Sequence, residues 1–136
     1  MTPGEHDLAT LLATLDPVLH DGVYVFATAA EPPPGLTPVL TFTEPEGVTL
    51  VVPEGQAEGV FPCRWITLRV HSSLAAVGML AAITATLAAE GIPCNAVSAY
   101  FHDHLFVPPE RAGDTLRVLG QLSANVQARW DRPSSA

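Results

Sequence analysis

The sequence is short of cysteine and of basic residues, and each shortage excludes a class of protein. Its two cysteines, Cys63 and Cys94, are too few for the disulfide framework of a small secreted domain, so we expect two reduced, buried thiols. Six Lys and Arg residues stand against 14 Asp and Glu, which gives a formal net charge of −8. Because phosphate binding needs clustered cations, we expect no nucleic-acid partner and no anionic membrane partner.

Long hydrophobic runs are also missing. The N-terminus has no basic segment followed by an apolar one, so we expect no signal peptide. The longest apolar stretch, residues 74–89, is rich in alanine and is interrupted by Gly78, Thr84 and Thr86. We therefore expect a packed helix instead of a membrane span, and a cytoplasmic protein.

The usual signatures of catalysis and of cofactor binding are absent from the sequence. The glycines do not follow the spacing of a phosphate-binding loop. His102 and His104 share a strand face and, with His71, offer metal ligands, but a histidine pair beside a turn is the simpler interpretation. Cys94 has no local context that would activate a thiol. We expect no enzyme, no metal and no cofactor.

The first half of the chain predicts one helix followed by strands. Leucines at 8, 11, 12 and 15 lie on one face of a helix over residues 6–16, and Pro17 disfavours helical geometry at Asp16. Val23–Phe26 is apolar and β-rich. Val39–Thr43 and Val48–Val52 flank a turn and predict a hairpin.

The second half predicts a strand, a helix, two strands and a final helix. Residues 65–70 alternate like a half-buried strand, with Trp65, Thr67 and Arg69 on one side. A helix should begin near Ser72 or Ser73, with one of these serines as its cap, and run to about Glu90, where Gly91 stops it. Strands are expected at 95–101 and 104–107, joined at His102-Asp103. The last helix should begin at Pro108-Pro109.

These elements favour an α+β fold of the ferredoxin-like βαββαβ type. The second half lacks the closing strand of that pattern, and the first half could supply it. A shared or permuted sheet is therefore our hypothesis. We place two units at residues 1–60 and 61–128, the first permuted or incomplete, and expect a frayed tail at 129–136.

Three segments of the second half resemble a known family. They are residues 66–78 (Ile-Thr-Leu-Arg-Val-His-Ser-Ser-Leu-Ala-Ala-Val-Gly), 91–100 and 103–108. Together they resemble the ACT domains of aspartokinase-like regulatory regions, and also small bacterial stand-alone proteins with two ACT-like units in tandem. The resemblance implies an ACT sandwich whose units pair, within one chain or as a homodimer. It also implies a small-molecule ligand, typically an amino acid.

The resemblance places the ligand contacts in the loop after the first strand and on the second strand. The positions are His71, Ser72, Ser73, Leu74, Val77, Gly78, Asn95, Ala96 and Val97. Physical chemistry supports the same place, because the amides at a helix start attract a carboxylate. Asp103 is added as a partner for a ligand ammonium group.

Each of these positions also has a purely structural interpretation. Ser72 and Ser73 could simply cap the helix, Gly78 could serve packing, Asn95 could be a turn residue, and Asp103 could stabilise a hairpin. The alternative function is accordingly a structural or protein-interaction module that keeps the fold without a ligand. An open polar cleft at residues 72–78 favours binding, whereas a cleft filled by His71 favours the alternative.

Overall fold

The computed structural model describes residues 4–5 and 7–130 of the chain. Its elements are α1 (Leu8–Ala13), β1 (Pro17–Leu19), β2 (Tyr24–Ala29), β3 (Leu40–Glu44), β4 (Gly47–Pro53), β5 (Val60–Leu68), α2 (Met79–Ala89), β6 (Asn95–Ser98), β7 (Asp103–Val107), the 3-10 turn η1 (Pro109–Arg111) and α3 (Ala112–Trp130). His6, where the expected first helix was to begin, and positions 131–136 of the expected tail lie outside the described residues.

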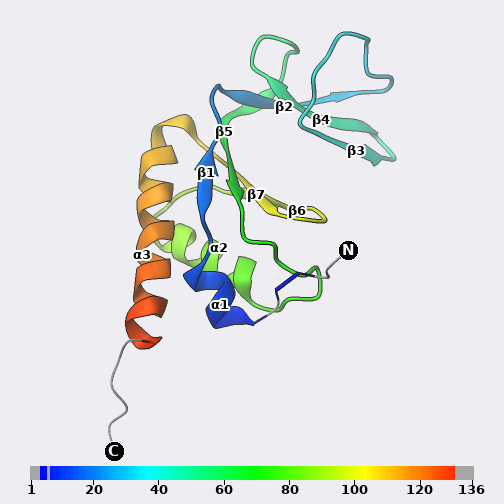
Figure 1. The fold of residues 1–136 in the computed structure, drawn as a ribbon. Coiled ribbons are helices and arrows are strands. Elements are labelled where there is room, and N and C mark those ends of the chain that lie inside the picture. Colours follow the sequence, from blue (N-terminus) through cyan, green and yellow to red (C-terminus); the bar gives the residue numbers. More distant parts are fainter. Residues whose placement is uncertain (1–3, 6, 131–136) are drawn as a thin grey trace, which may run out of the picture.

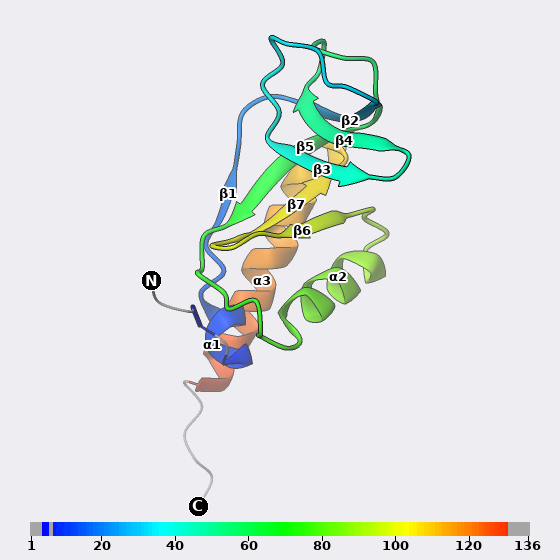
Figure 2. The same ribbon diagram turned by 90° about the vertical axis from the view of Figure 1, so that its right-hand side faces the viewer.

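The described strands form one seven-stranded antiparallel sheet, in the order β3-β4-β2-β5-β7-β6, with β1 beside β5. The long strand β5 belongs to both halves. One of its edges pairs first with β2 and then with β1, and its other edge pairs with β7. Figure 1 shows β2, β3 and β4 bending away from the helices at the top of the molecule, and Figure 2 shows β3 above β6.

Strand β1 closes the second unit. The order β1-β5-β7-β6, with α2 and α3 as the two helices, is that of a βαββαβ unit whose last strand comes from the start of the chain. The expected α+β ferredoxin-like fold and the shared sheet are confirmed. The closing strand, Pro17–Leu19, lies within a segment for which the sequence predicted only a helix end.

Two of the three core clusters in the described residues bear on how the halves of the chain join; the third, Val25, Leu50 and Val52, lies within the first half. On one face, Ile66 and Leu68 of β5 and Leu105 of β7 pack with α1, α2 and α3. On the other face, Val51, Cys63 and Phe106 join β4, β5 and β7. The second core therefore connects the two halves of the chain through side chains as well as through the sheet.

The segment 14–16 sets the direction of β1. Asp7 caps α1 by accepting a hydrogen bond from Thr10 N at 3.0 Å. The helix ends at Ala13, and Asp16 has a left-handed φ of 50°, so it cannot continue a right-handed helix into Pro17. Asp16 also forms an ion pair with Arg69, at 2.9 Å, beside the end of β5.

The structure corrects the expected start of the second helix. Helix α2 begins at Met79, and its N-cap is Gly78, so neither Ser72 nor Ser73 caps it. The reason lies in the loop: Ser72 hydrogen bonds to Asp103, and Ser73 N donates to Glu5 O. The positive φ of Gly78, 99°, then separates this loop from the right-handed helix.

Two strand boundaries and one turn also differ from expectation. Strand β5 covers 60–68 instead of 65–70, because the bulge at Phe61 (φ 53°) lets its first residues pair with β2. Strand β6 ends at Ser98, and the turn spans residues 99–102, closed by Ala99 N donating to His102 O.

Among the helices of the described residues, none combines the length and the apolar character needed to cross a membrane.

Candidate functional site

A polar cleft opens where the loop after β5, the start of α2 and the β6–β7 hairpin meet. Its volume is about 130 Å³. It is lined by Ser72, Ser73, Leu74, Ala76, Gly78, Met79, Leu80, Ala81, Ser98 and Asp103. These residues come from two places in the chain that the β5–β7 and β6–β7 pairings bring together.

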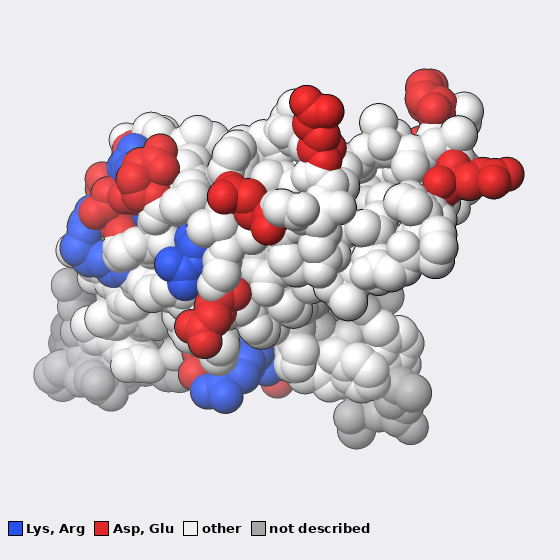
Figure 3. Space-filling view, turned by 90° about the horizontal axis from the view of Figure 1, so that it is seen from above, with Lys and Arg blue, Asp and Glu red and all other residues white. Residues whose placement is uncertain are grey.

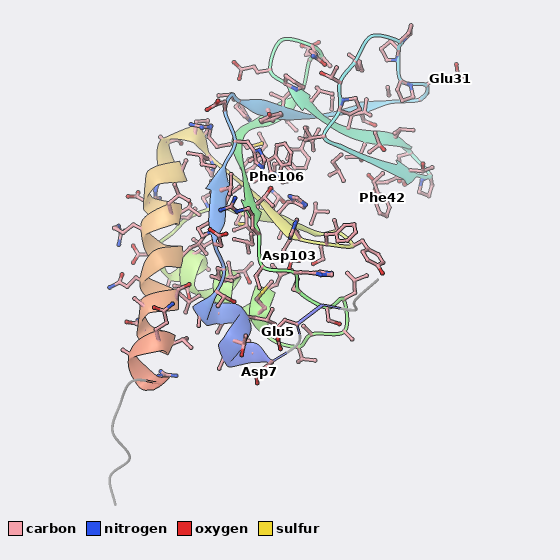
Figure 4. All side chains as sticks on the ribbon, in the orientation of Figure 1. Glu5, Asp7, Glu31, Phe42, Asp103 and Phe106 are labelled. Atoms are coloured by element: carbon pink, nitrogen blue, oxygen red, sulfur yellow. The ribbon has the colours of Figure 1, made fainter. Side chains whose placement is uncertain are left out.

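Asp103 is the buried acidic group of the cleft. It is 4% exposed, and its carboxylate accepts hydrogen bonds from Ser72 Oγ at 2.8 Å and from Ser98 Oγ at 2.5 Å. Ser98 and Asp103 are direct partners in the β6–β7 ladder, so both point to the same face of the sheet. Figure 4 shows Asp103 on the side of the sheet nearer α1 and α2, and Phe106 nearer β2. The two serine hydroxyls hold the carboxylate in a fixed orientation.

The start of α2 supplies the opposite polarity. Gly78 provides no side-chain hydrogen bond to the helix within the described part of the chain. The amides of the first turn, from Met79 to Ala81, therefore lack the usual cap, and these three residues line the cleft. Because the helix dipole adds partial positive charge here, this wall favours an anion while Asp103 favours a cation.

A short N-terminal segment holds the loop in place. Glu5 N donates to His71 O, and Ser73 N donates to Glu5 O, both at 2.7 Å. This parallel bridge between Glu5 and Ser72 orders the loop without using the serine hydroxyls. The cleft is therefore preformed by backbone contacts that a ligand need not create.

The structure brings together half of the predicted contact positions. Those that line the cleft are Ser72, Ser73, Leu74, Gly78 and Asp103, and those that do not are His71, Val77, Asn95, Ala96 and Val97. Side chains alternate along a strand, so Val97, the partner of His104, faces away from Asp103. Val77 is 82% exposed, and the ring of His71 lies beside Phe101, 5.4 Å between centroids.

Five lining residues were not predicted: Ala76, Met79, Leu80, Ala81 and Ser98. The three helical ones were missed because the helix was expected to start several residues earlier. The signal for Ser98 was the ladder register, since a hairpin turn at 99–102 pairs Ser98 with Asp103. The turn that the sequence predicted, at 102–103, would have given Ser98 a different partner in the ladder.

A second polar group lies on the opposite face of the sheet. Trp65 Nε1 donates to His104 Nδ1 at 3.0 Å, and Thr67 Oγ1 lies 3.0 Å from the same nitrogen and 2.7 Å from His20 Nε2. Burial lowers the pKa of His104, and nearby His102 and His20 lower it further, against an opposing effect of Asp103. Burial also lowers the pKa of His20, which stacks on Trp65. These surroundings favour the neutral form of both imidazoles.

Other reactive groups are not assembled into a centre. Cys63 and Cys94 are both free, and burial raises the pKa of each thiol to about 11. His102 lies in the hairpin turn and contacts Val70 O, apart from the face that carries His104. Across residues 4–5 and 7–130, no three His, Cys, Asp or Glu side chains are grouped to hold a metal ion. Figure 3 shows acidic side chains spread over one face, with basic ones among them and no continuous basic patch.

Comparison with known proteins gives a consistent result. Two ACT-domain family models match the chain, at residues 3–60 and 60–121. A solved Vibrio cholerae protein of unknown function, described as a possible transport protein, is 40% identical, with a TM-score of 0.76 over 85% of this chain and 95% of that one. No curated protein matches the chain.

Two more distant structures share the fold. An Agrobacterium tumefaciens protein is 20% identical, with a TM-score of 0.61 over 79% of this chain and 87% of its own. A structure of aspartokinase alpha and beta subunits is 13% identical, with a TM-score of 0.59 over 78% of this chain and 95% of that one. The two adjoining family matches, the 40% identical relative and the βαββαβ arrangement agree: the chain belongs to the ACT-domain family.

Proposed function

We propose that this chain binds a free amino acid in the polar cleft and acts as a regulatory module of the cytoplasm, without catalytic activity. ACT domains generally bind small-molecule ligands in regulation. The observation that carries the amino-acid assignment is that one cleft has both Asp103 and the uncapped start of α2 on its walls.

The polarity of the cleft matches a zwitterion. An ammonium group has three donors and no acceptor, which suits a buried carboxylate that already accepts from Ser72 and Ser98. A ligand carboxylate suits the free amides of Met79, Leu80 and Ala81. A ligand with only one of these charges would leave the other wall without a partner.

The remaining chemistry supports binding without catalysis. Both thiols have a pKa of about 11, so they are protonated near neutral pH and are poor nucleophiles. The hydrogen-bond partners of Asp103 in the cleft are the hydroxyls of Ser72 and Ser98, which hold a carboxylate but are weak bases. We assign Asp103 a role in holding the ligand.

We propose that the units at 1–60 and 61–128 act together and that regulation involves a second copy of the chain. Strands β3 and β6 are the two ends of the described strand order, and β1 also pairs with a single strand, β5; edge strands of this kind favour pairing. A ligand in the cleft would favour the arrangement in which the loop at 72–78 and the hairpin tip at 99–102 are held together.

Calorimetry with alanine, N-acetylalanine and alaninamide tests the binding. We expect alanine to bind and both blocked forms to bind at least about tenfold more weakly, since each loses a charge-assisted contact. Asp103→Asn should weaken alanine binding by a similar factor, and Asp21→Asn, an exposed change of the same charge, should not. Equal binding of the three compounds would contradict the assignment.

A protein-interaction module is the second candidate, and one observation favours it. Leu74, Val77, Tyr100 and Phe101 are between 50% and 82% exposed and lie on the loop and hairpin that frame the cleft. If no amino acid binds and Val77→Asp abolishes self-association measured by sedimentation, this candidate replaces the first.

A further inference from the structure

We infer that the ligand is an amino acid with a large apolar side chain, which lies in a groove adjoining the polar cleft; this inference rests on the proposed function. The apolar groove is lined by Ser73, Leu74, Ala75 and Tyr100, and its volume is about 260 Å³. Ser73 and Leu74 line the polar cleft as well. A ligand held at its charged end in the cleft can therefore extend its side chain directly into the groove.

The walls of the groove select an apolar side chain. None of its four lining residues is charged, and Ser73 Oγ is already engaged by Ala75 N at 3.1 Å. Leu74 is 66% exposed and Tyr100 is 52% exposed, so large apolar surfaces remain open beside a polar site. Covering them with a hydrocarbon side chain removes apolar area from water, which a small or polar side chain would not do.

Electrostatics also favours an apolar ligand side chain over a charged one. A ligand with an acidic side chain would bring a second negative group near Asp103, on a chain whose net charge is already −8. A basic side chain would lie in a groove without a carboxylate among its lining residues. Both therefore bind less well than a leucine or a phenylalanine.

The groove wall formed by Tyr100 is held by other aromatic rings. Tyr100 packs edge-on against Phe101, with 4.9 Å between centroids, and Phe101 lies 5.4 Å from His71. His71 directly precedes Ser72 of the cleft, so this row of rings joins the hairpin tip to the ligand loop. It places Tyr100 beside the loop at 73–75.

Calorimetric titration of the full chain with alanine, leucine, phenylalanine and glutamate tests the inference. Leucine and phenylalanine should bind at least about tenfold more tightly than alanine, and glutamate no more tightly than alanine. Tyr100→Ala, which changes the groove but not the cleft, should reduce the leucine-to-alanine affinity ratio at least about threefold while leaving alanine affinity within about twofold. Phe42→Ala is the matched control, since Phe42 is also 66% exposed but lies on β3 and lines neither the groove nor the cleft (Figure 4).

The outcomes separate this inference from the proposed function. If alanine binds and depends on Asp103 but leucine binds no better, the apolar groove is overturned and the amino-acid site stands. If Tyr100→Ala weakens alanine and leucine equally, the groove does not hold the side chain and the inference is overturned as well. If none of the four amino acids binds, the proposed function itself fails.

Discussion

His104 shows how hydrogen bonding fixes a protonation state at the scale of a residue. The indole of Trp65 can only donate, so the lone pair of His104 Nδ1 must be free to accept. A proton on Nδ1 would face the Trp65 N–H and break this bond. Burial and the neighbouring His102 and His20 oppose protonation too, and the opposing influence of Asp103 is smaller. His104 is therefore a structural histidine whose neutral form is favoured by its surroundings.

This arrangement predicts a stability that falls in mild acid. The pKa of His104 in the folded chain lies below its ordinary value of 6.5, so the unfolded chain binds the proton more readily. The stabilising contribution is complete above pH 6.5 and is lost as the pH falls through the folded value. Thermal denaturation from pH 7.5 to 5 should show a smaller acid-dependent loss in His104→Gln than in the natural chain, because carboxylate titrations are common to both. Identical pH profiles would contradict the prediction.

At the scale of the element, α2 and α3 use glycine in opposite ways. Gly78 stops the loop from joining α2, with a φ of 99° that L side chains rarely adopt, and a Cβ there would lie 3.3 Å from Leu8. Gly120 lies on the exposed face within α3, and a Cβ there would meet no atom within 4 Å. The same substitution should therefore have opposite effects at the two sites.

Gly78→Ala should destabilise the chain by about 1–2 kcal/mol, the cost of a left-handed conformation in an L residue. Gly120→Ala should stabilise it by up to about 1 kcal/mol, because alanine loses less entropy in a helix. Urea denaturation of both variants measures the difference. Gly78→Ala should also weaken amino-acid binding, since Gly78 lines the cleft and precedes its amides. If both changes shift stability in the same direction, the left-handed φ of Gly78 does not disfavour an alanine at that position.

At the scale of the whole molecule, the sequence predicts local periodicity better than pairing. The alternation around Trp65 and Thr67 and the hairpin of β3 and β4 were visible, because the residues that define them are neighbours in the chain. Strand β1 was not visible: three residues are too short for a period, and they become a strand only because β5 offers them an edge. Met79, Leu80 and Ala81 of the cleft were missed for a related reason, since Glu5 and Gly78 set the start of α2 in ways that no helical pattern encodes.

The permuted order of the second unit predicts that its strands can be reconnected. Opening the chain between Asp21 and Gly22, both exposed, and joining residue 130 to Gly4 by a Gly/Ser linker of about ten residues puts α1 and β1 directly after α3. Two hydrogen bonds already tie α1 to α3, from Ser123 Oγ to Leu12 O and from Gln127 Nε2 to Ala13 O. We expect this permutant to stay folded, within about 2 kcal/mol of the natural order, since every contact of the described sheet is kept.

Deleting the same segment should have the contrary effect. A chain of residues 22–130 loses Leu11, Leu12 and Leu15, which are 0%, 7% and 0% exposed, and uncovers the edge of β5 at Ile66–Leu68. Since each buried leucine contributes about 2–5 kcal/mol against a total of about 5–15 kcal/mol, the truncated chain should not fold cooperatively. Circular dichroism during heating distinguishes the two chains. If the truncated chain melts as sharply as the permutant, α1 and β1 are not needed for folding, and the second unit is complete without strand β1.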